Sequence, residues 1–106
     1  MRFTLFIFIM AVVFTAGCKK EEPGPNEVFI TGGEFSPSSL TVSVGTKVTW
    51  TNKESSAHTV TSDSGPMLSS IDMGKTQTYT FTFFTAGTYP YHCKFHSSMK
   101  GTVVVQ

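Results

Sequence analysis

Apolar residues in this chain recur at every second position over short runs, which is the pattern of half-buried β-strands. Val48 and Trp50 fall on one face of such a run, and Tyr79, Phe81 and Phe83 fall on one face of another. No window after residue 26 shows a helical spacing, so we expect strands there. The runs that predict strands cover residues 28–30, 39–45, 47–52, 58–62, 77–83, 87–93 and 101–106.

Turn-forming residues separate these runs, as expected for short strands at regular spacing. The pattern predicts an all-β fold, a Greek-key β-sandwich or barrel of about seven to eight strands, built mainly from antiparallel pairs. Trp50 and Phe81 are the first candidates for its core, where one buried aromatic side chain contributes roughly 1.5–3 kcal/mol. The turn signals are Gly32-Gly33, Ser36-Pro37, Gly45, Asn52, Ser64-Gly65-Pro66, Gly74 and Ala86-Gly87.

The start of the chain has a different pattern. A mainly apolar run from Phe3 to Ala16 follows Arg2. It is shorter than the roughly 20 apolar residues that a membrane-spanning helix needs. A short apolar run behind a basic residue and before small residues predicts a secretory signal peptide, residues 1–17. A retained membrane anchor and a buried core helix are the alternatives.

The end of this run, TAGC from Thr15 to Cys18, resembles the lipobox of bacterial lipoproteins, although Thr15 replaces the usual leucine. The resemblance implies cleavage before Cys18, a lipid on its thiol, and a lipid-anchored linker over residues 18–26. The following KKEE resembles a surface-display signal of some Gram-negative lipoproteins, with a solvated spacer as the alternative. We therefore expect an exported membrane lipoprotein that faces the periplasm or lies on the cell surface.

The charge balance shifts when the predicted signal peptide is removed. The chain has 8 Lys and Arg against 7 Asp and Glu, and losing Arg2 leaves seven basic against seven acidic residues. A near-neutral domain without a basic patch argues against nucleic acid as a partner. It also argues against strong electrostatic steering. Residues 27–106 are long enough for one small domain, which we expect to be a monomer.

Cys93, His96 and Met99 stand together as C-x-x-H-x-x-M. With Cys18 lipidated, Cys93 has no cysteine to pair with, which leaves an intermolecular disulfide, a reactive thiol or a metal ligand. Thiolate and thioether are soft ligands, and their combination with imidazole favours copper. His58, at the start of an earlier strand, is the candidate for a second imidazole. Two histidines and a thiolate in one plane, with a weak axial methionine, form the type 1 (blue) copper electron-transfer site.

Three segments resemble cupredoxins of the plastocyanin/amicyanin family: FSPSSLTVSVGTKVTWTN, AHTV and GTYPYHCKFHSSMKGTVVV. The resemblance implies that electrons pass at the edge of His96, in an apolar patch for which Phe95 and Met67 are candidates. The family usually has Asn where this chain has Thr59, which leaves open whether the surroundings of the site are looser. The resemblance also implies one copper ion with four ligands: His58, Cys93, His96 and, in the axial position, Met99.

We expect a one-electron carrier outside the cytoplasm and not an enzyme. Its redox partner would be a c-type cytochrome or an exported oxidase or dehydrogenase, and its lipid anchor would hold it on a membrane. A copper-binding or copper-delivery protein is the main alternative, and an adhesion module on the same fold is another. His92-Cys93 also resembles the dipeptide that links two coppers in copper oxidases and nitrite reductases. A catalytic copper needs further histidines, however, and only His92, expected on the surface, is spare.

Overall fold

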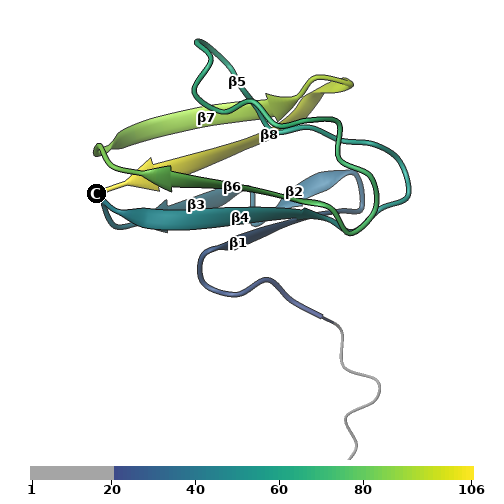
Figure 1. Ribbon diagram of the computed structural model, residues 1–106, viewed down its shortest axis with the longest axis horizontal. Helices are drawn as coiled ribbons and strands as arrows, with labels where there is room; N and C mark the ends of the chain where they lie inside the picture. Colours follow the sequence, from purple (N-terminus) through teal and green to yellow (C-terminus); the bar gives the residue numbers. More distant parts are fainter. Residues whose placement is uncertain (1–20) are drawn as a thin grey trace, which may run out of the picture.

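The computed structural model describes residues 21–106, so the predicted signal peptide and Cys18 lie outside the described residues. Two four-stranded sheets face each other (Figure 1). The described residues contain no helix that is long and apolar enough to cross a membrane. The strands are β1 Glu27–Thr31, β2 Glu34–Ser36, β3 Ser39–Val42, β4 Thr46–Asn52, β5 Thr61–Ser62, β6 Thr78–Phe83, β7 Gly87–Cys93 and β8 His96–Val105.

The sheets have the strand orders β2-β1-β4-β6 and β3-β8-β7-β5. The predicted all-β class is confirmed. The expectation of antiparallel pairing holds only in part, because β1 and β4 pair in parallel, as do β3 and β8. Parallel pairs arise here because the chain repeatedly crosses from one sheet to the other, so that strands far apart in sequence become neighbours. The short strand β2 was not predicted, since its three residues are too few to show an alternation.

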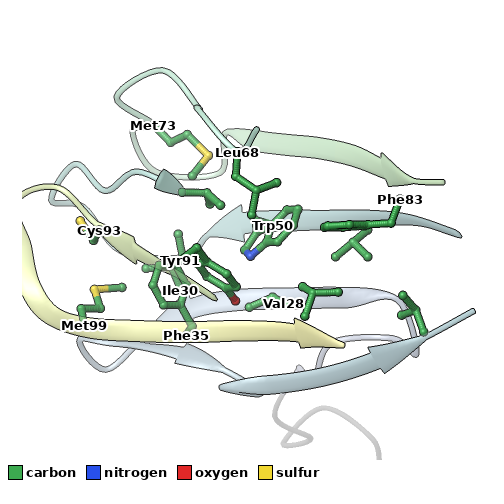
Figure 2. Packing of buried hydrophobic residues seen from close by; sticks show 14 of the residues in the cluster. Val28, Ile30, Phe35, Trp50, Leu68, Met73, Phe83, Tyr91, Cys93 and Met99 are labelled. Carbon is green, nitrogen blue, oxygen red and sulfur yellow. The ribbon is translucent and has the colours of Figure 1, made fainter. Parts of the chain in front are cut away.

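The core lies between the two sheets and is rich in aromatic rings (Figure 2). Trp50 is fully buried, as predicted, whereas Phe81 is only partly buried and packs against the edge of the core. The rings of Trp50 and Tyr91 meet edge to face, with their centroids 5.5 Å apart. This geometry is favourable for aromatic pairs. One ring from β4 and one from β7 thus join the two sheets.

Tyr91 depends on a glycine in the neighbouring strand. It pairs with Gly101 across β7 and β8, and a Cβ atom at Gly101 would lie 2.4 Å from the phenol oxygen. Neither that oxygen nor Nε1 of Trp50 has a hydrogen-bond partner within the described part of the chain. Burial raises the pKa of Tyr91 to about 12. The ring is therefore held by packing and not by hydrogen bonds.

The last two strands are joined by a very short turn. β7 ends at Cys93 and β8 begins at His96, which leaves only Lys94 and Phe95 between them. The sequence pattern predicted that the final strand would begin near residue 101. It misses the first half of β8 because Ser97 and its neighbours are polar and exposed and do not alternate. The turn lies at the opposite end of the sandwich from the C-terminus (Figure 1).

Candidate metal centre

Three of the predicted ligands meet at this end of the sandwich. One imidazole nitrogen each of His58 and His96 and the sulfur of Cys93 all lie within 4.8 Å of one another. The Nδ1 atom of His58 is 3.7 Å from the Cys93 sulfur. His58 and Cys93 are buried, whereas His96 is exposed. The centre therefore lies just below the surface, with one imidazole at the solvent boundary.

Two parts of the backbone position the predicted ligands. Cys93 ends β7, and the two-residue turn brings His96 back beside it. His58 lies in the loop between β4 and β5, where it forms a two-way backbone bridge with Met73: their N–H groups donate to each other's carbonyls at 3.1 and 2.9 Å. The ligands thus come from two segments that are 35 residues apart in sequence.

Met99, the predicted axial ligand, lies on β8 and is 5% exposed. It belongs to the same buried cluster as Cys93, and both side chains lie at the same end of the core (Figure 2). The position is thus suited to a thioether ligand, and axial ligation by Met99 stays a prediction.

Thr59 joins the two ligand-bearing segments directly. Its hydroxyl accepts a hydrogen bond from the backbone N–H of Lys94 at 2.9 Å. The same oxygen is 2.9 Å from the hydroxyl of Thr61. The loop that carries His58 is therefore bonded to the turn that follows Cys93, although the family's usual asparagine is absent here.

The second nitrogen of His58 is held by a carboxylate that sequence reasoning did not identify. Nε2 of His58 lies 2.7 Å from Oε1 of Glu54 and 3.3 Å from the Ser56 hydroxyl. The other carboxylate oxygen, Oε2, accepts a hydrogen bond from the backbone N–H of Gly33 at 2.7 Å. With Nε2 donating to Glu54, the lone pair on Nδ1 faces Cys93 and is free for a metal. The sequence gives no signal for this contact, because a spacing of four residues brings side chains together only in a helix, and this segment is a loop.

The hydrogen bond from Gly33 is the main cause that lowers the pKa of Glu54, with His58 adding to it. Glu54 is in turn fixed by the fully buried Asn52, whose side-chain oxygen accepts from the Glu54 backbone N–H at 2.9 Å. The amide nitrogen of Asn52 donates to the carbonyls of Ser56 and Met73, each at 2.9 Å. This one amide therefore fixes both sides of the loop that carries His58.

The remaining candidate residues lie outside the cluster. Nδ1 of His92 is 2.7 Å from a carboxylate oxygen of Asp63, and His92 is not among the grouped ligands. Phe95 is 46% exposed and Met67 is 38% exposed, and an apolar patch formed by both stays a prediction. Phe95 is the residue directly before the exposed His96.

A family model described as a cupredoxin-like domain matches residues 3–105. The chain belongs to the cupredoxin family. It is 45% identical over 71 residues to amicyanin from Paracoccus denitrificans, a match covering 63% of this chain and 54% of that protein. It is 39% identical over 87 residues to amicyanin-alpha from Methylorubrum extorquens, covering 78% of this chain and 73% of that one. The Cu(I) form of an amicyanin mutant has a TM-score of 0.72 and 38% identity, covering 82% and 87% of the two chains.

The donor set of this cupredoxin fits a soft metal ion. Burial raises the pKa of the Cys93 thiol, but hydrogen bonds outweigh it and lower that pKa to about 6. The strongest of these comes from the backbone of Thr59. At neutral pH the sulfur is therefore largely a thiolate, the form that binds metals. A thiolate and two imidazoles are suited to copper and are a poor match for hard cations such as Mg²⁺.

Proposed function

We propose that the protein holds one copper ion in a type 1 site and carries single electrons. The convergence of His58, Cys93 and His96 is the observation that supports this proposal most strongly. The proposed axial ligand is Met99, buried beside them. A bound copper ion supplies the one-electron couple between Cu(I) and Cu(II).

Different residues of the chain hold the proposed ligands and expose one of them to a partner. Glu54 fixes the imidazole of His58 through Nε2, and the backbone of Thr59 lowers the pKa of the Cys93 thiol. Because both segments are tied together through Thr59, the ligands have little freedom to rearrange between the two copper states. His96 is the exposed ligand, so its edge is the route for electrons.

The proposed redox partner is a c-type cytochrome or an exported oxidase or dehydrogenase that docks on the apolar patch of Phe95 and Met67. Both side chains are exposed. Since the mature chain is near neutral, docking should depend only weakly on ionic strength. A steep fall of the electron-transfer rate with added salt would contradict this docking mode.

The proposed location is outside the cytoplasm, on a membrane, through a lipid on Cys18. The apolar run, the TAGC sequence and the charged linker support this proposal. Mass spectrometry of the protein recovered from a bacterial membrane tests it, with Cys18→Ser as the control. We expect a diacylglycerol mass on the native protein and a water-soluble or unprocessed chain for the variant. An unmodified Cys18 in the mature protein would contradict the anchor.

Titration with Cu(II), followed by visible absorption and metal analysis, tests the copper site. We expect one copper per chain and a strong thiolate-to-copper band that disappears on reversible reduction. Cys93→Ser and His58→Ala should both lose the band. His92→Ala is the matched control, because His92 neighbours Cys93 in sequence but binds Asp63. A protein that held only colourless Cu(I), without reversible oxidation, would favour copper delivery, and two coppers per chain would revive the enzyme alternative.

A further inference from the structure

The linker folds back before it reaches the first strand. The backbone N–H of Glu27 donates to the carbonyl of Gly24 at 3.2 Å, and the N–H of Gly24 donates to the Glu27 carboxylate at 2.8 Å. The carbonyl of Asn26 accepts from the N–H of Thr49 in β4 at 3.1 Å. These bonds close a turn at the start of β1, and Figure 1 shows the chain reversing beneath that strand.

Beyond this turn, the linker is held at the end of β4. The Lys53 ammonium lies 2.6 Å from a Glu21 carboxylate oxygen. The same ammonium is 4.7 Å from the centroid of the Phe29 ring. The backbone N–H of Lys53 also donates to the carbonyl of Ile30 at 2.9 Å. Lys53 thus bonds to β1 and reaches the linker with its side chain.

The low exposure of Phe29 is independent evidence that the linker lies against the outer face of the sheet. Its neighbours in β1, Val28 and Ile30, belong to the core cluster, so Phe29 points to the outer face of the sheet. It is nevertheless only 7% exposed. A groove of about 720 Å³ lies beside it, lined by Phe29, Leu40 and the linker residues 21–25. The linker therefore covers part of the outer face.

The place where the linker leaves the domain is the metal end. β1 and β4 run in parallel, with Ile30 opposite Asn52, so β1 ends beside the start of the loop that carries His58. Lys53 directly precedes Glu54, the residue that holds His58. Two residues, Lys19 and Lys20, lie between Cys18 and Glu21. The three residue-to-residue steps span roughly 10 Å when the chain is extended.

We propose that this linker holds the domain with its metal end toward the lipid surface. The inference rests on the lipidation of Cys18 in the proposed function. The metal end then faces the membrane to which the protein is attached, and the C-terminal end of the sandwich points away from that membrane. A redox partner that docks at His96 then approaches along the membrane surface.

Resonance energy transfer to lipid headgroups tests this orientation. The lipidated, copper-loaded full chain is reduced to Cu(I) and placed in phosphatidylcholine–phosphatidylglycerol vesicles that contain a headgroup-labelled acceptor lipid. A donor dye is attached through Ser55→Cys, at the metal end, or Thr85→Cys, at the far end; both positions are exposed. We expect severalfold faster transfer from residue 55 than from residue 85.

Charge reversal tests the role of the ion pair. A surface ion pair contributes up to about 1 kcal/mol. Breaking it should therefore lower the ratio of chains with the linker held against the domain to chains with a released linker by up to about fivefold. Lys53→Glu should therefore reduce the difference between the two dye positions, and Glu21→Lys combined with Lys53→Glu should restore it. Lys47→Glu, the same charge change at the opposite end of β4, should leave the difference unchanged.

Each outcome separates this inference from the lipid anchor. Vesicle flotation reports anchoring, and the absorption band after reoxidation reports an intact site. A chain that fails to float overturns both the anchor and the orientation. A chain that floats but transfers energy equally from the two positions overturns the orientation alone. If the difference in transfer rate between the two dye positions were the same in Lys53→Glu and in the native chain, the ion pair would have no role in the orientation.

Discussion

Replacing Cys93 with serine tests whether the metal-free fold is already built around a thiolate. Burial raises the pKa of Cys93, but hydrogen bonds, led by the one from the backbone of Thr59, outweigh it and lower the pKa from 9.0 to about 6. A carboxyl or thiol group whose pKa is lowered by folding makes the native state bind fewer protons than the unfolded state. The free energy of unfolding should therefore rise with pH between about 6 and 9.

The size of this effect follows from the two pKa values. Each pKa unit corresponds to about 1.4 kcal/mol, so the full change is about 4 kcal/mol at most. It is fully present above pH 9, the pKa of the unfolded thiol, and is lost as the pH falls through about 6. Cys93→Ser keeps the side-chain shape and has no group that titrates in this range, so the variant should lack this contribution.

Urea unfolding of the metal-free protein at several pH values measures the effect. The quantity of interest is the free energy of unfolding of the native protein minus that of Cys93→Ser, because this difference isolates the contribution of the Cys93 thiol. We expect this difference to grow from pH 6 to pH 9. The ultraviolet absorbance of the thiolate should rise with a midpoint near pH 6. A stability difference that stays flat across this window would refute the preformed thiolate.

Three further substitutions test the packing around the site through urea unfolding. Gly101→Ala brings a Cβ 2.4 Å from the Tyr91 ring and should cost about 1–3 kcal/mol, whereas Gly74→Ala, whose nearest neighbour is 3.4 Å away, should cost little. Tyr91→Phe removes a buried hydroxyl without a partner and should leave stability within about 1 kcal/mol of native or raise it. Thr59→Val leaves the Lys94 N–H without its acceptor and should cost about 1–3 kcal/mol, while Thr59→Ser should retain the bond. An equal loss from both Thr59 variants would show that the hydrogen bond is unimportant.

The cluster of His58, Cys93 and His96 was predictable because two of its three members are local in sequence. Cys93 and His96 lie at fixed spacing, and soft donors at that spacing indicate copper without knowledge of the fold. His58 required an assumption about which distant strand returns to the loop, and the structure places it there. The alternation that marks β4 and β6 likewise predicted those strands, since each has one face in the core.

The residues that hold His58 were not predicted, because their roles depend on tertiary contacts. Glu54 acts through a hydrogen bond from the distant Gly33, and Asn52 acts through carbonyls of Ser56 and Met73. Their side chains read in the sequence as ordinary turn or surface residues. A buried asparagine can be recognised only when the loop that it closes is known.

The pairing of the strands and the orientation of β1 also could not be predicted from the alternation of apolar residues. Three apolar residues in a row, VFI, do not reveal which of them faces the core, and only the structure shows that Phe29 points to the linker. The parallel pairs β1–β4 and β3–β8 follow from the path of the chain between the sheets, to which local alternation is insensitive.

X-ray absorption at the copper edge of the Cu(II)-loaded protein tests the central claim most directly. The arrangement of His58, Cys93 and His96 predicts one short copper–sulfur bond and two imidazole nitrogens, with the sulfur bond absent in Cys93→Ser and one imidazole missing in His58→Ala. A copper ion surrounded only by nitrogen and oxygen, or a spectrum that neither substitution changes, would contradict the account.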